Sequence, residues 1–223
     1  KNKLKLVSKS SNESSLALAG RYFFYTDKIA KAKQCIEKIL NKNRKHINML
    51  SIFGWIYLLS GDEKYHQKSM HLFRKSMKLS QPYFDLNALM GRVKYLEIEH
   101  KFNKCIQELD SAIKLYPSFI PAYEEKGRIL MIMGKWKECN KLIDIIIDLD
   151  EYSIMGYYIK CIYLLINEYK PTLTLQMLEK LVTCINRKEP TNASIRYECT
   201  HVLSRLIHQH IPYVNIIIQL AEQ

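Results

Sequence analysis

The chain has 223 residues, of which 48% are hydrophobic, and a formal net charge of +12 from 34 Lys and Arg against 22 Asp and Glu. This apolar content excludes a disordered chain, and the stretch at 154–166, interrupted by Lys160, is too short to span a bilayer. The positive surplus favours acidic partners, whether acidic proteins, nucleic acid or an anionic membrane face, and says nothing about the fold.

The first residues differ in composition from the rest. Residues 1–13 are rich in Lys, Asn and Ser and predict a disordered leader or linker. The sequence does not open with Met, so we expect an excerpt of a longer protein. Residues 14–223 predict a helical array, with about five hairpins in 14–184 and an irregular helix pair in 192–221.

Small residues recur along the array at nearly constant spacing. They follow one another at steps of 34, 37, 36 and 34 residues: Gly20, Gly54, Gly91, Gly127 and Cys161. A two-helix unit of about 34 residues needs such a residue where its helices A and B cross closely. In each unit, a large apolar residue should follow this small residue three positions later. A turn residue should follow it seven positions later, and a small packing residue twelve positions later. Ala32 and Cys139 occupy the last position.

The second and third units depart from this spacing. The second has three extra residues in its turn near 62–66, and the third has two extra before Phe102. Pro82, Pro117 and Pro121 fall between hairpins, where a proline can end one helix or open the next. These features predict an all-α tetratricopeptide-repeat solenoid, a right-handed superhelix of antiparallel helix pairs.

The sequence lacks the common motifs of catalytic sites. The sequence has no Gly-rich phosphate loop, no G-x-S-x-G elbow and no H-E-x-x-H, and the spacing of His208 and His210 does not put both on one helical face. The acids at 144–151 are interpreted as a solvated helix end. We therefore expect no enzyme activity, no cofactor, no metal and no small-molecule substrate.

Six cysteines occur without any C-x-x-C pair, mostly among apolar neighbours. They predict reduced, buried thiols in a cytosolic-type compartment. In particular, Cys105, Cys139 and Cys161 each occupy a packing position of a different hairpin, too far apart to form a disulfide.

The residue after each small residue is predicted to face the concave side of the array, where the A helices lie. These residues form a candidate partner-binding strip: Arg21, Trp55, Arg92 and Arg128. Arg and Trp are favoured at binding hot spots, and Arg binds carboxylates in a bidentate manner. Asp85 and Glu124 nearby moderate the charge. The alternative is that each arginine pairs with a neighbouring acid and only solvates the inner face.

A protein-binding scaffold is the first interpretation, and other functions remain as alternatives to it. The net charge permits an RNA-processing helical-repeat protein, but lysines and acids are interleaved and no RNP-like or Arg-rich run exists. A co-chaperone-like carboxylate clamp would need basic and Asn residues at set inward positions, from which Ala17 and Trp55 depart. A generic cytosolic repeat adaptor is the remaining alternative.

A narrower resemblance rests on particular strings. They are LALAGRYFFYTDKIAKAKQCIEKI at 16–39, the expanded second and third units, and the junction YPSFIPAY at 116–123. With these the chain resembles an N-terminal-half segment of the tetratricopeptide repeat protein 21 family, over about residues 16–220. That resemblance implies a subunit of intraflagellar transport complex A, acting in retrograde ciliary transport and cilium assembly. It also implies partners among the other subunits, in the cytoplasm, cilium and ciliary base.

Overall fold

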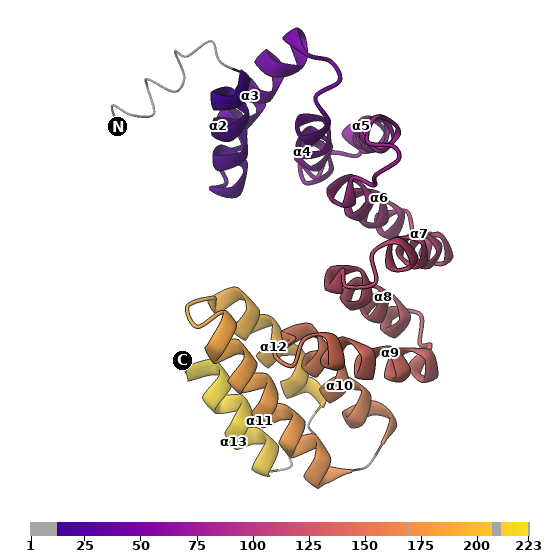
Figure 1. The fold of residues 1–223 in the computed structure, drawn as a ribbon. Helices are drawn as coiled ribbons and strands as arrows, with labels where there is room; N and C mark the ends of the chain where they lie inside the picture. The colour runs from indigo at the N-terminus through magenta and orange to yellow at the C-terminus, as the bar shows by residue number, and fades with distance from the viewer. Residues whose placement is uncertain (1–12, 169, 207–210, 223) are drawn as a thin grey trace. The chain divides into compact units, whose positions relative to one another are not determined.

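A computed structural model of the chain describes residues 13–168, 170–206 and 211–222. These residues form α-helices and one short 3-10 helix, without any strand (Figure 1). The helices are α2 (Glu13–Tyr25), α3 (Ile29–Lys42), α4 (Ile47–Leu58), η1 (Glu63–Tyr65), α5 (His66–Leu79), α6 (Leu86–Ile98), α7 (Phe102–Leu115), α8 (Ile120–Ile132), α9 (Trp136–Leu149), α10 (Ile154–Asn167), α11 (Pro171–Lys188), α12 (Ala193–Leu206) and α13 (Ile211–Glu222).

Successive helices pair as the sequence predicts. Contacts join α2 to α3, α4 to α5, α8 to α9, α10 to α11 and α12 to α13. The prediction of an all-α tetratricopeptide-type solenoid is therefore confirmed. Of the predicted leader at 1–13, residues 1–12 lie outside the described residues, and Glu13 is the first residue of α2. None of the described helices combines the length and the apolar character needed to cross a membrane.

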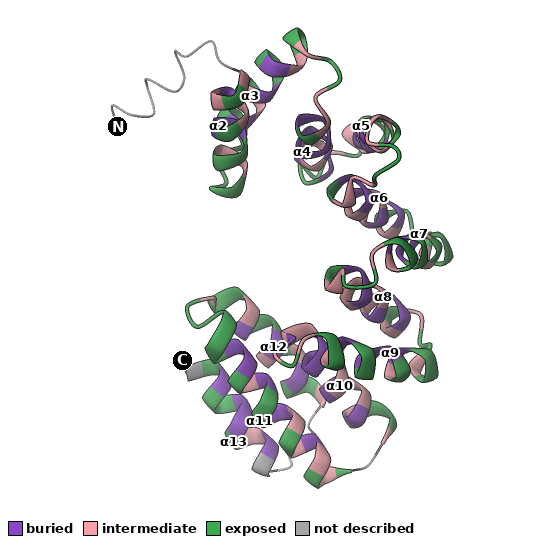
Figure 2. Cartoon of the chain, viewed as in Figure 1, coloured by how far each residue is buried: buried purple, intermediate pink, exposed green. Residues whose placement is uncertain are grey.

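The array divides into two compact units, residues 1–108 and 109–223, hereafter unit 1 and unit 2. Each has one central A helix that contacts neighbours on several sides. In unit 1, α4 contacts α2, α3, α5 and α6, and in unit 2, α10 contacts α8, α9, α11 and α12. Such helices need apolar residues around most of their circumference, which explains the sequences INMLSIFGWIYL and IMGYYIKCIYLLIN. Figure 2 shows the buried residues concentrated between neighbouring helices.

The glycines at the repeated small-residue positions lie where neighbouring helices cross closely, but the space around them differs from one crossing to the next. In unit 1, a Cβ added at Gly54 or at Gly91 would lie within 3.0 Å of ring atoms of Phe73, whose side chain is fully buried. The ring thus lies between α4 and α6. In unit 2, a Cβ at Gly127 would lie 3.2 Å from Ile159 Cδ1. At Gly20 the nearest atom would be Ile36 Cγ1 at 3.4 Å.

The predicted turn irregularities have distinct structural forms. The three extra residues of the second unit form η1, whose N-cap Asp62 accepts a hydrogen bond from the Lys64 backbone. The two extra residues of the third unit lie after Gly91, so that α6 extends seven residues past this glycine, whereas α8 extends five past Gly127. The hairpin turns use a residue with positive φ: Asp27, Gly61, His100 and Gly134.

The small residues at the packing positions are fully buried. Ala32, Cys105, Cys139 and Cys161 have no exposed surface, and burial raises the pKa of the Cys139 thiol to about 11. All six cysteines are free thiols. The prediction that all of them are buried is wrong for Cys35, which is partly exposed. Its Cβ still lies at the α2–α3 contact, 3.5 Å from where a Cβ added at Gly20 would stand, so Cys35 is at the edge of that contact.

Candidate protein-docking site

The four residues of the predicted strip lie on α2, α4, α6 and α8, and the first three belong to unit 1. Arg21 is exposed on α2. Trp55 is partly buried on α4, where its Nε1 donates to the backbone carbonyl of Asn87 at 3.1 Å. Its ring also makes an edge contact with Phe73, with 5.9 Å between the ring centroids. Trp55 therefore fixes α4 against α6 as well as presenting a face to solvent.

The two remaining arginines of the strip have acidic neighbours inside their own units. In unit 1, the Arg92 guanidinium forms an ion pair with Glu108. In unit 2, Arg128 donates to Glu125 at 3.0 Å from Nε and 2.6 Å from Nη2. About a fifth of each of these four side chains is exposed. These contacts match the alternative in which each arginine pairs with a neighbouring acid.

A second candidate site in unit 2 lies where three A helices begin, and we call it the α10 pocket. It has a volume of about 440 Å³ and is lined by residues of α8, α10 and α12, by the last residue of α11 and by the connections before α10 and α12. Ser153 is the N-cap of α10, because its hydroxyl accepts a hydrogen bond from the Gly156 backbone at 2.9 Å. This cap fixes the connection that forms one side of the pocket.

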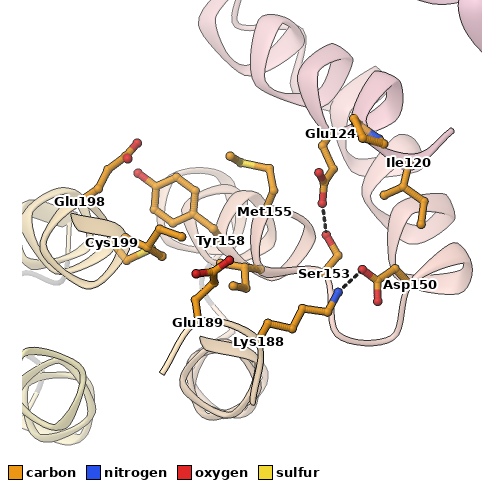
Figure 3. A pocket seen from close by; sticks show the side chains of 13 residues that line it. Ile120, Glu124, Asp150, Ser153, Met155, Tyr158, Lys188, Glu189, Glu198 and Cys199 are labelled. Atoms are coloured by element: carbon orange, nitrogen blue, oxygen red, sulfur yellow. Dashed lines mark hydrogen bonds and ion pairs between the residues drawn. The ribbon is translucent and has the colours of Figure 1, made fainter. Parts of the chain in front are cut away.

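The inner surface of the α10 pocket is largely apolar. Ile120 of α8, Ile154, Met155 and Tyr158 of α10, and Ile195 of α12 contribute to it (Figure 3). Tyr158 is buried. Its phenol pKa is raised by burial first, and then by Cys199 and the carboxylate of Glu198. The pocket can therefore accommodate the aliphatic part of a side chain.

Four acidic residues surround this apolar surface. They come from different elements: Glu124 from α8, Asp150 and Glu189 from the connections, and Glu198 from α12. Lys188 is the one basic residue in the described lining, and its ammonium group forms an ion pair with Asp150. The pocket consequently has a negative balance in a chain whose net charge is +12.

Two of these acids, Glu124 and Asp150, have pKa values shifted in opposite directions. The Glu124 carboxylate accepts a hydrogen bond from Ser153 Oγ at 2.6 Å, but its burial raises the pKa, and the nearby Asp150 adds to the rise. Burial alone would also raise the pKa of Asp150, but hydrogen bonds from Lys188 and the Tyr152 backbone outweigh it and lower the pKa. Asp150 is thus stabilised as an anion, whereas Glu124 is a carboxylate in poorly solvating surroundings.

No pattern in the sequence indicates this pocket. The expectation of a solvated helix end at 144–151 fits Asp144, which is exposed and paired with Lys160 at 3.0 Å. Asp150 is instead partly buried in the pocket lining. Glu124 and Glu198 are 74 residues apart, so only helix stacking brings them together, and no local motif signals it.

Unit 1 contains a cleft of the opposite charge, which we call the α6 cleft. Its volume is about 610 Å³, and it lies among α5, α6 and α7. The basic lining residues outnumber the single acid, Glu108; they are His71, Arg74, Arg92, Lys101 and Lys104.

Neither site has the composition of a metal centre. Within the ranges that the structure describes, no three His, Cys, Asp or Glu side chains are grouped so that they could hold a metal ion. His208 and His210 lie outside those ranges. What both pockets offer is charge and shape for a side chain or peptide.

Comparison with known proteins decides the family. The family described as "Tetratricopeptide repeat protein 21 N-terminal ARM repeat" matches residues 1–140, more than half of the chain. The chain belongs to the tetratricopeptide repeat protein 21 family. Tetratricopeptide repeat protein 21B of Mus musculus is 24% identical over 203 residues, covering 91% of this chain and 15% of the relative. Tetratricopeptide repeat protein 21A of Homo sapiens is 21% identical over 228 residues, covering 99% and 17%.

The chain therefore spans about a sixth of the length of these family members.

Similarity to solved structures supports the fold alone. PilF of Pseudomonas aeruginosa aligns with a TM-score of 0.65 at 13% identity, covering 93% of this chain and 97% of that one. YrrB, described as a tetratricopeptide protein with an unusual peptide-binding site, has a TM-score of 0.55 at 13% identity, covering 90% and 96%. Repeat proteins of this fold and family are typically non-catalytic binding scaffolds.

Proposed function

We propose that this chain is a non-enzymatic, protein-binding segment of an intraflagellar transport complex A subunit, acting in retrograde ciliary transport and cilium assembly. The observation that carries the proposal is membership of the tetratricopeptide repeat protein 21 family, with similarity across nearly the whole chain. Its place of action would be the cytoplasm at the ciliary base and the cilium. Its partners would be other subunits of that complex.

The geometry supports the binding part of this proposal. Both units present clefts on their helical repeats, and stacked repeats form extended surfaces for partner segments. In the α10 pocket, charged side chains surround an apolar surface, an arrangement typical of recognition sites. A generic repeat adaptor would share these features, so the identity of the partner is what separates the two functions.

Affinity purification from ciliated cells tests the proposal. The tagged 223-residue chain is expressed, and co-purifying proteins are quantified by mass spectrometry against an unrelated tetratricopeptide protein as bait. We expect complex A subunits to be enriched by about tenfold or more over the control bait, since a specific interface discriminates by at least 1.4 kcal/mol. Enrichment of chaperones or of unrelated cytosolic proteins alone would contradict the proposal.

RNA binding is the alternative that a salt titration tests. Phosphate contacts give an affinity that falls steeply with salt concentration. We expect only weak binding to single-stranded RNA, abolished at physiological salt. A submicromolar affinity that persists at about 0.15 M salt would favour the RNA-processing function.

The predicted strip is a second proposed contact surface, for an acidic or helical segment of a complex A subunit. Its test is the Arg92→Ala, Arg128→Ala double variant, with folding checked by circular dichroism. Folding must be checked because both arginines form intramolecular ion pairs. If the folded double variant binds the partner within about twofold of the wild type, a difference of less than 0.5 kcal/mol, the strip is not the site.

A further inference from the structure

The charge of the α10 pocket is not explained by the fold of unit 2. Of the four acids in the lining, Asp150 is neutralised by Lys188. The carboxylates of Glu124, Glu189 and Glu198 have no ion-pair partner among the described residues of the chain. Like charges held near one another repel, and an arrangement that only stabilised the fold would include cations.

The positions of these carboxylates suggest what would complete the site. In Figure 3, Glu124 on α8 and Glu198 on α12 lie on two sides of Met155 and Tyr158. Arginine and lysine have an aliphatic stem and a cationic head, and they commonly lay the stem on an apolar surface while the head stays with polar groups. The Met155–Tyr158 surface would receive the stem, and the acids on either side would receive the head.

The state of Glu124 adds a second argument. Its carboxylate is partly buried, close to Asp150, and its one hydrogen bond comes from Ser153. Burial disfavours an anion unless an opposite charge compensates it. Lys188 lowers the pKa of Glu124 from a distance, but its ammonium group is paired with Asp150 and the pKa stays raised, so a cation bound in the pocket would complete the compensation.

We propose that the α10 pocket binds a basic segment of a partner protein, inserting one arginine or lysine side chain between Glu124 and Glu198 over Met155 and Tyr158. The volume of about 440 Å³ lies in the range of pockets that enclose a small ligand, so one long side chain fits within it. The inference rests on the proposed function in that the partner is a protein, but it does not require that partner to belong to complex A.

The binding test uses the whole 223-residue chain and four fluorescein-labelled peptides. They share the sequence Gly-Ser-Leu-Xaa-Leu-Ser-Gly, with Arg, Lys, Gln or Glu at the central position, and binding is followed by fluorescence anisotropy at low salt. We expect the Arg and Lys peptides to bind about tenfold or more tightly than the Gln peptide, and the Glu peptide to bind more weakly still. Equal affinity for all four peptides would overturn the proposal.

Variants assign the effect to the pocket. Glu198 is exposed on α12, so Glu198→Gln removes its charge without disturbing a packed side chain. We expect Glu198→Gln and Glu124→Gln each to weaken binding of the Arg peptide by about fivefold to tenfold. The matched control is Glu179→Gln, an exposed acid on α11 outside the pocket, which is expected to stay within about twofold of the wild type. Unchanged affinity in both pocket variants would place the peptide elsewhere and overturn the inference.

A further measurement separates a partner protein from a second copy of the chain. Sedimentation velocity of the wild type is expected to show a monomer. A concentration-dependent dimer that Glu198→Gln dissociates would mean that a second copy occupies the pocket, and would overturn the partner assignment. If complex A subunits co-purify with the wild type but the peptides bind irrespective of charge, the proposed function stands and this inference fails. Charge-selective peptide binding without complex A subunits gives the reverse result.

Discussion

The two units of this chain use the same repeat, but they differ in how their helices close and in what their pockets attract. In unit 1, α4 and α6 meet through the Phe73 ring, which fills the space left by Gly54 and Gly91. In unit 2, Gly127 faces the flexible ends of aliphatic side chains, of which Ile159 Cδ1 would lie nearest to an added Cβ, at 3.2 Å. A rigid ring between two glycines tolerates no added atom, whereas an isoleucine terminus can rotate away. The same small-residue position is thus strict at the Phe73 crossing of unit 1 and tolerant at Gly127 of unit 2.

The two units also differ in the charge of their pockets. The α6 cleft in unit 1 is basic, and the α10 pocket in unit 2 is acidic. The net charge of +12 suggests acidic partners throughout, but it describes only the sum. An acidic pocket in a basic chain shows that the local charge of a unit can oppose the net charge, and it predicts that the two units bind segments of opposite charge.

The largest expected effect concerns Gly91. We expect Gly91→Ala to lower the free energy of unfolding of unit 1 by about 2–3 kcal/mol, because its Cβ would overlap the buried Phe73 ring. The gain in helix propensity of about 1 kcal/mol does not offset this. Denaturant titration followed by Trp55 fluorescence, with Trp136 replaced by Phe, reports on unit 1, because Trp55 contacts Phe73.

Gly127→Ala is the matched change in unit 2, followed by Trp136 with Trp55 replaced by Phe. There the clash with Ile159 Cδ1 is mild, so we expect a change within about 1 kcal/mol of zero. Gly127→Leu is expected to cost about 1–3 kcal/mol, since three further carbons must enter the same packed crossing. Equal costs for Gly91→Ala and Gly127→Ala would remove the difference between the units.

A smaller effect is expected at the hairpin turns. Gly134 has a φ of +68°, and a Cβ there would meet no atom within 4 Å, so Gly134→Ala tests the backbone alone. We expect a loss of about 1–2 kcal/mol, the strain of an L residue in the left-handed region.

In unit 1, His100 has a φ of 54° without being glycine. His100→Gly is expected to gain about 0.5 kcal/mol, the relieved strain exceeding the added chain entropy. Loss of stability in His100→Gly would show that the histidine side chain contributes there.

The sequence predicts the repeats well and the sites poorly, for a physical reason. Repeat positions such as Gly127 and Cys139 are recognisable because packing within one hairpin restricts residue size at a fixed spacing. The partner of Gly91, in contrast, is Phe73 on the helix of the preceding hairpin, and no spacing rule within one repeat reveals it. The acids of the α10 pocket come from three successive hairpins, and a carboxylate has the same appearance in sequence whether it is solvated or lines a pocket.

The smallest expected effect on stability concerns Glu124 and its dependence on pH. Burial raises the pKa of Glu124 in the folded chain, so the folded state holds this proton more tightly than the unfolded state does. The penalty for the ionised carboxylate is therefore fully present above the folded pKa. This penalty fades as pH falls through the raised folded pKa, and it is gone below the ordinary pKa of a glutamate. Asp150 acts in the opposite sense, because its pKa is lowered, and its contribution to stability is lost in acid.

Glu124→Gln removes the buried charge and keeps an oxygen that can accept the Ser153 hydroxyl. We expect the variant to raise the midpoint of unit 2 unfolding slightly at neutral pH, and the gain to disappear in acid, where the wild-type carboxyl group is also neutral. The measurement is the unfolding midpoint reported by Trp136 across this pH range, with Glu179→Gln as the control that should show neither change. An acid that lowers the stability of its own unit while strengthening the binding of a cation is one retained for binding. A variant that is destabilised at neutral pH would instead show that Glu124 serves the fold through Ser153.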